Sequence, residues 1–226
     1  MRETFEKELR HLQDELLALG SMVEEALLES VEVLRRRDAE GARRLVAGDR
    51  ALNERRFAIE GAALVLIATQ QPMAGDLRAI AAVLEIATEL ERIGDYAKGI
   101  ARISLMIGDE PLLKPLVDIP LMARAAAGML HRALDAFVRR DVALARAIPQ
   151  EDATVDRLYD KVYRDLLDRI VADTKNIDRA THLLWVAHNL ERAADRVSNI
   201  CERVVFTATG EMAELDDGEG ATDLAG

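Results

Sequence analysis

The chain has 226 residues, a formal net charge of −11, one cysteine, five prolines and an aromatic content of only 4%. The negative charge argues against general nucleic-acid binding, which requires a basic surface, and the single Cys201 excludes an internal disulfide framework. The longest apolar run, residues 62–68, is far too short to span a bilayer, and the charged N-terminal stretch lacks the apolar core of a secretory signal. We therefore expect a soluble, cytoplasmic protein with an aliphatic core.

Three long helices are predicted in the first half of the chain. From residue 9 onward, apolar residues recur at alternating spacings of three and four, which is typical of a helix packed along one seam. This helix should end at residues 35–37, three arginines whose charges favour a helix C-terminus. A second helix is predicted from about residue 39 to 69 and a third from about 76 to 107. The segment between them contains a proline and a glycine and predicts a turn.

The second half follows the same plan after a linker. Residues 108–120 contain three prolines and are predicted to be this linker. Helices are then expected from about 121 to 140, from 141 or 142 to 173, and from about 178 to 209. The acidic, glycine-containing segment 210–226 is expected to be a disordered tail.

An internal repeat links the two halves. Sliding the sequence by 100 residues places Leu84, Ala87, Leu90, Glu91, Arg92, Asp95 and Ile100 on identical residues, which is seven identities in 17 positions. Further upstream the offset becomes 103, and Arg36-Arg37-Asp38 aligns with Arg139-Arg140-Asp141. The sequence therefore predicts an all-α fold of two homologous antiparallel three-helix bundles side by side, residues 1–107 and 121–209, with six long helices.

Carboxylates recur at equivalent places in both repeats. On the last helix of each repeat two acids stand four residues apart and share a helix face, namely Glu91 with Asp95 and Glu191 with Asp195. The preceding helix of each repeat has the same four-residue step, in Asp49 with Asn53 and in Asp152 with Asp156, and Asn199 and Glu202 continue the stripe in the second repeat. Two neighbouring helices that each offer oxygen ligands could hold a metal ion.

A solvated acidic face is the alternative explanation for these residues. Acids four residues apart occur often in so charged a chain, and Arg92 and Arg192 could neutralise them in place of a metal. Recurrence within the same Leu-Glu-Arg-x-x-Asp frame favours the metal hypothesis, although repeats preserve structural features as well.

The segment from Leu190 to Glu202, Leu-Glu-Arg-Ala-Ala-Asp-Arg-Val-Ser-Asn-Ile-Cys-Glu, closely resembles the signature of the PhoU family, the phosphate-transport-system regulatory proteins. Residues 90–95, Leu-Glu-Arg-Ile-Gly-Asp, resemble it as well, and the resemblance extends from about residue 3 to 208. It implies two similar three-helix bundles, which usually form a homodimer. It also implies a cytoplasmic negative regulator of phosphate uptake and of the phosphate-starvation (Pho) response.

The resemblance further implies partners and a cofactor. The partners are the ATPase of the phosphate-specific ABC transporter and a membrane histidine kinase that senses phosphate, so the protein would be an adaptor, without enzymatic activity, that reaches the membrane only through them. The cofactor is a multinuclear iron or zinc cluster, with Glu91, Asp95 and Asp49 as ligands in the first repeat and Glu191, Asp195, Asp152, Asp156 and Glu202 in the second. Gly99 and Arg102 stand where the second repeat has Asn199 and Glu202, so we expect weaker binding in the first repeat.

A carboxylate-bridged metalloenzyme of the helical-bundle type is the alternative function. Such enzymes generally use Glu-x-x-His pairs from two helices, whereas His188-x-x-Glu191 has the reverse order and Thr88 stands at the equivalent of His188. A structural dimer of helices whose acids bind no metal is a third possibility.

Overall fold

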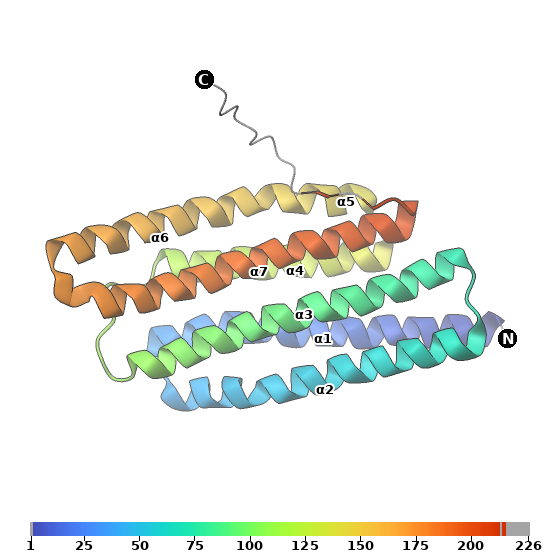
Figure 1. The fold of residues 1–226 in the computed structure, drawn as a ribbon, viewed down its shortest axis with the longest axis horizontal. Helices are drawn as coiled ribbons and strands as arrows, with labels where there is room; N and C mark the ends of the chain where they lie inside the picture. The colour runs from blue at the N-terminus through green and yellow to red at the C-terminus, as the bar shows by residue number, and fades with distance from the viewer. Residues whose placement is uncertain (1, 213, 216–226) are drawn as a thin grey trace, which may run out of the picture.

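Seven α-helices and two short 3₁₀ segments make up the described part of the chain, residues 2–212 and 214–215 of the computed structural model (Figure 1). The α-helices are α1 (Arg2–Arg36), α2 (Ala39–Gln70), α3 (Ala74–Ile107), α4 (Asp118–Arg139), α5 (Val142–Ala147), α6 (Asp152–Ala172) and α7 (Ile177–Thr209). Within these residues there is no strand, and no helix combines the length and apolar character that a membrane span requires.

Two three-helix bundles lie side by side, which confirms the predicted fold class. The first consists of α1, α2 and α3, and the second of α4, the α5–α6 arm and α7. The bundles meet along two pairs of helices, α3 with α7 and α1 with α4, and each pair runs antiparallel (Figure 1).

The fifth predicted helix is interrupted, so the prediction of one helix up to residue 173 is wrong. The chain forms the short α5, then the 3₁₀ segment η1 (Ile148–Glu151), and then α6. Pro149 lies within η1 and is buried. Proline has no N–H to donate, and its ring clashes with the preceding turn of an α-helix. The corresponding part of the first repeat has no proline, and α2 runs through it without a break.

The start of α4 also differs from the sequence-based boundary. Helix α4 begins at Asp118, inside the segment predicted as linker, and Pro120 lies in its first turn, where a missing N–H costs no hydrogen bond. Helix α1 begins at Arg2, ahead of the apolar seam that starts at residue 9. Most of the predicted disordered tail, residues 213 and 216–226, lies outside the described residues.

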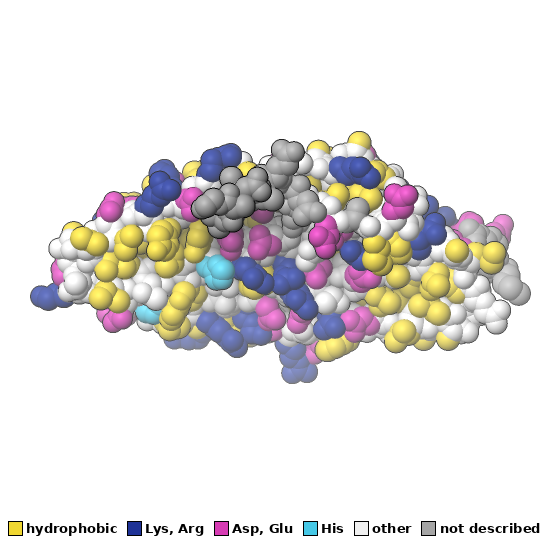
Figure 2. Space-filling view, turned by 45° about the horizontal axis from the view of Figure 1, so that its top comes forward, with side chains coloured by type: hydrophobic (Ala, Val, Ile, Leu, Met, Phe, Trp, Pro, Cys, Tyr) yellow, Lys and Arg dark blue, Asp and Glu magenta, His cyan; other side chains and the backbone are white. Residues whose placement is uncertain are grey.

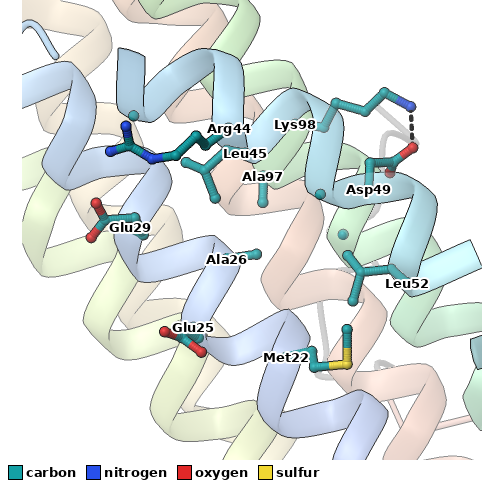
Figure 3. A pocket seen from close by; sticks show the side chains of 13 residues that line it. Met22, Glu25, Ala26, Glu29, Arg44, Leu45, Asp49, Leu52, Ala97 and Lys98 are labelled. Atoms are coloured by element: carbon teal, nitrogen blue, oxygen red, sulfur yellow. Dashed lines mark hydrogen bonds and ion pairs between the residues drawn. The ribbon is translucent and has the colours of Figure 1, made fainter. Parts of the chain in front are cut away.

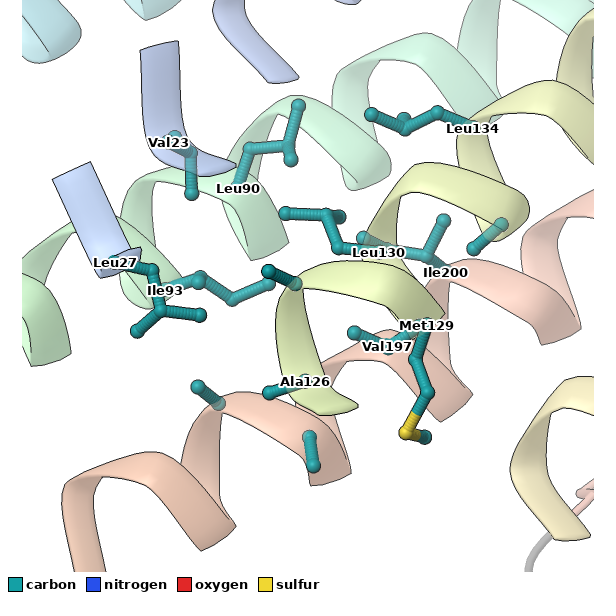
Figure 4. Close-up of a cluster of buried hydrophobic side chains, with 14 of the residues drawn as sticks. Val23, Leu27, Leu90, Ile93, Ala126, Met129, Leu130, Leu134, Val197 and Ile200 are labelled. Atoms are coloured by element: carbon teal, nitrogen blue, oxygen red, sulfur yellow. The ribbon is translucent and has the colours of Figure 1, made fainter. Parts of the chain in front are cut away.

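One continuous hydrophobic core joins the two bundles. Val23 of α1, Ile93 of α3, Leu130 of α4 and Ile200 of α7 are fully buried and converge between the halves (Figure 4). At Gly20 of α1 an added Cβ atom would lie only 2.2 Å from Leu134 Cδ1 of α4, so glycine allows these two helices to approach closely. The bundles therefore share a core rather than touching through polar surfaces.

Candidate metal centre

The carboxylates predicted for the first repeat lie together between α2 and α3. Asp49 of α2 is only 9% exposed, and Lys98 Nζ of α3 donates a hydrogen bond to its Oδ2 at 2.6 Å. Asn53 Nδ2 donates to the same oxygen at 3.2 Å. Lys98 Nζ also lies 3.4 Å from Asp95 Oδ1, so a single ammonium group bridges carboxylates of two helices.

Glu91 shares this location. Burial raises the pKa of its carboxyl above the usual value, and the negative charges of Asp95 and Asp49 raise it further, whereas Arg56 of α2 lowers it. The three predicted carboxylates are therefore within electrostatic reach of one another. Lys98 is the residue that sequence reasoning missed, although the change to Ser198 in the second repeat was a visible signal.

In the second repeat Glu191 of α7 faces α6. Burial raises the pKa of the Tyr159 hydroxyl on α6, and the nearby charge of Glu191 raises it further. Glu191 Oε2 is buried, lies 3.1 Å from His188 Nδ1, and has no hydrogen-bond partner among the described residues. That contact is an ion pair only when the imidazole is protonated, so this oxygen can accept a further cation.

The remaining second-repeat acids lie along the same two helices. Asp152 is the first residue of α6, Asp156 follows one turn later, and Asp195 lies half-buried on α7. Desolvation raises the pKa of Asp156, and the charge of Asp160 adds to this. Within residues 2–212 and 214–215, no three His, Cys, Asp or Glu side chains are arranged to hold a metal ion. Binding would therefore require these carboxylates to turn toward one another.

The second repeat nevertheless has buried oxygens that could accept a cation. Besides Glu191 Oε2, the hydroxyl of Ser198 is fully buried on α7 and has no hydrogen-bond partner in the described structure. Buried polar atoms are normally hydrogen-bonded, and oxygen donors of this kind suit hard or borderline cations. The carboxylates of the first repeat have no such need for a cation, because Lys98 already supplies a positive charge there.

Glu202 and Asn199 lie elsewhere. Asn199 Nδ2 donates to Glu89 Oε2 of α3 at 3.1 Å, across the junction of the two bundles. Glu202 accepts hydrogen bonds from the backbone N–H of Leu215 and from Arg203. Both side chains line a hollow of about 500 Å³ with residues of α2 and α3, and no residue of α6 takes part in it.

A groove of about 560 Å³ opens beside the first carboxylate cluster, with the Lys98–Asp49 pair in its wall (Figure 3). Leu52 and Ala97 provide apolar lining, and Arg44 and Glu29 bring charge to it. Three lining residues are glycines with larger counterparts in the second repeat, namely Gly41, Gly48 and Gly94 against Leu144, Glu151 and Ala194. These small residues distinguish the first repeat from the second.

Comparison with known proteins gives a consistent result. The family model described as PhoU domain matches residues 16–104 and again residues 119–204. The chain is 34% identical over 208 residues to the phosphate-specific transport system accessory protein PhoU homolog of Aquifex aeolicus, which covers 92% of this chain and 94% of that protein. It is also 34% identical to the phosphate-specific transport system accessory protein PhoU of Escherichia coli, over 92% of this chain and 86% of that one.

Two crystal structures have the same fold over nearly their whole length. The phosphate transport system regulatory protein PhoU from Streptococcus pneumoniae superposes with a TM-score of 0.85 at 31% sequence identity, covering 92% of this chain and 99% of that one. PhoU from Pseudomonas aeruginosa gives a TM-score of 0.86 at 32% identity, covering 92% and 100%.

Proposed function

The chain belongs to the PhoU family, and from this premise we propose that it is a cytoplasmic negative regulator of phosphate uptake and of the phosphate-starvation response. The observation that carries the proposal is the match of two PhoU domains in tandem, together with superposition on two PhoU structures of which 99% and 100% are covered. The names of the relatives describe accessory and regulatory proteins of phosphate transport. On this proposal the protein works by binding partners and is not an enzyme.

The proposed partners are the ATPase of the phosphate-specific ABC transporter and a sensor histidine kinase, and a second copy of this chain is the proposed dimer partner. Exposed apolar side chains support a binding role. On α6, Tyr163, Leu167 and Val171 are four residues apart, each at least 44% exposed, and share one face. Figure 2 shows hydrophobic side chains on both sides of a charged central region of one face.

The carboxylates support a second part of the proposal, a zinc or iron centre. Glu191, Asp195, Asp152 and Asp156 would hold the metal between α6 and α7, whereas Glu202 lines the separate hollow beside α2 and α3 and is not part of this set. When bound, the metal would supply positive charge that offsets the repulsion between these acids. The carboxylates themselves would tie the two helices together.

Deletion of the gene from its host tests the regulatory role. In phosphate-rich medium we expect the deletion strain to express an alkaline phosphatase reporter of phosphate starvation, because its repressor is missing. A plasmid copy of the wild-type gene should restore repression. Unchanged reporter expression in a host without a second copy of the gene would overturn the proposal.

A further inference from the structure

Among the positions at which the carboxylate clusters of the two repeats differ, one exchanges a cation for a neutral hydroxyl. The 100-residue offset that aligns Glu91 and Asp95 with Glu191 and Asp195 also aligns Lys98 with Ser198. One repeat therefore has a cation where the other has a neutral hydroxyl. Both residues lie three positions after the aspartate of the repeated Leu-Glu-Arg-x-x-Asp frame, so each lies one turn further along the same side of its helix.

Lys98 already links the carboxylates of the first repeat. Its ammonium group lies 2.6 Å from Asp49 Oδ2 and 3.4 Å from Asp95 Oδ1, and so connects α2 to α3. The side chains of Lys98 and Asp49 are only 21% and 11% exposed, so solvent screens this contact weakly. A metal ion bound by the same two oxygens would have to displace the ammonium group or remain beside it against charge repulsion.

Ser198 supplies no such charge in the second repeat. Its side chain is completely buried, and its hydroxyl has no hydrogen-bond partner within the described residues. Glu191 Oε2 is a second buried oxygen without a hydrogen-bond partner among the described residues, and its contact with His188 Nδ1 at 3.1 Å is an ion pair only when the imidazole is protonated. A cation bound beside either oxygen would satisfy a group that the described structure leaves without a hydrogen bond.

We infer that Lys98 is a built-in replacement for the metal ion in the first repeat, so that the second repeat alone binds metal. The inference rests on the metal centre proposed above and makes it more specific. Metal binding in the first repeat is then not only weaker but prevented by a side chain of the protein. It also predicts that removal of this one lysine opens a second metal site.

Zinc content of the purified full-length protein tests the inference. After dialysis against Zn²⁺ and removal of free metal, elemental analysis should find zinc in the wild type that is lost in Asp195→Asn and retained in Asp95→Asn. Lys98→Ser should carry additional zinc, and this addition should disappear in Lys98→Ser/Asp95→Asn. Lys98→Arg, which keeps the positive charge, is the matched control and should gain none. Circular dichroism of each variant verifies the fold.

The outcomes separate this inference from the proposed metal centre. Loss of zinc from the single variant Asp95→Asn, or no gain of zinc in Lys98→Ser, would overturn the inference. The proposed metal centre would still be supported in either case if the zinc of the wild type depends on Asp195. Zinc in Lys98→Ser but none in the wild type would support the replacement role of Lys98 and remove the centre of the second repeat. Zinc in neither protein would overturn both.

Discussion

Two ion pairs join α6 to the linker between the repeats and to the start of α4. Lys114, in the linker, is only 8% exposed and forms an ion pair with Asp165 of α6. Lys161 Nζ of α6 donates to Asp118 Oδ1, at the start of α4, at 2.8 Å, and Asp118 is also buried. Lys114 and Asp118 are four residues apart on one segment, and Lys161 and Asp165 are four residues apart on α6. The two reciprocal ion pairs hold these segments together.

Asp165→Asn should destabilise the protein in a pH-dependent way. The hydrogen bond from Lys114 holds the pKa of the Asp165 carboxyl below its usual value, although burial acts in the opposite direction. Neutralising Asp165 leaves a buried ammonium group without its charged partner, and we expect a loss of about 1–2 kcal/mol at pH 7, moderated by the solvent exposure of Asp165.

The pH dependence follows from the direction of that shift. A carboxyl whose folded-state pKa lies below its unfolded value of about 3.9 stabilises the protein above that value and loses this effect as pH falls through the folded-state pKa. Urea unfolding at neutral and at acidic pH should therefore show the difference between wild type and variant shrinking below about pH 4. Asp168→Asn, on an exposed residue of α6, is the control. An equal difference at both pH values would contradict the role assigned to this charge.

At the scale of the elements, the Arg-Arg-Asp motif that recurs with an offset of 103 is a helix-to-helix joint. Arg37 and Arg140 have φ angles of 55° and 54°, which end α1 and α4 in the left-handed conformation. The following aspartates cap the next helices, since Asp38 Oδ1 accepts from the N–H of Gly41 at 2.8 Å and Asp141 Oδ1 from that of Leu144 at 2.9 Å. The repeated motif therefore encodes the geometry of a turn rather than a binding site.

Removal of either cap should cost similar amounts of stability. We expect Asp38→Ala and Asp141→Ala each to lower the free energy of unfolding by about 1 kcal/mol, because an orphan backbone N–H loses its acceptor. The two joints lie at opposite ends of the molecule (Figure 1), so the losses should add in the double variant. Asp38→Asn and Asp141→Asn keep an equivalent cap and should remain close to wild type in urea unfolding. Near-wild-type stability of both alanine variants would refute this role.

At the scale of the whole molecule, the fold could be predicted further than the site. Apolar periodicity was sufficient to predict the helices, and the internal repeat was sufficient to predict their duplication. Both features depend only on the order of residues along the chain. The break at Pro149 could not be predicted, because a proline near the start of a helix is compatible with either a continuous or an interrupted helix. The partners of Lys98 and Asn199 depend on which helices are adjacent and how far long side chains reach, and one sequence contains no such distances.

The shared core implies that the two repeats unfold together. Buried residues from Phe5 to Val205 form one continuous cluster across the junction of the bundles. Trp185 is the only tryptophan and lies on α7, in a hollow that Met106 and Ile107 of α3 also line. Its fluorescence therefore reports on α7 and on this junction with the first repeat, whereas far-ultraviolet circular dichroism reports on helices of both halves. If the core acts as one cooperative unit, the two signals should give the same urea midpoint.

A substitution far from Trp185 makes this test decisive. Ile59 lies on α2, which among the described helices packs only against α1 and α3, and its side chain is 2% exposed. Ile59→Ala should cost about 2–5 kcal/mol through lost burial and the resulting cavity. In a cooperative molecule that loss shifts the Trp185 fluorescence transition as far as the circular dichroism transition, even though the mutated helix packs against α1 and α3 and not against α7. Leu64→Ala, at an exposed position of the same helix, should shift neither. A fluorescence midpoint that stays at its wild-type value in Ile59→Ala would mean that each repeat unfolds on its own.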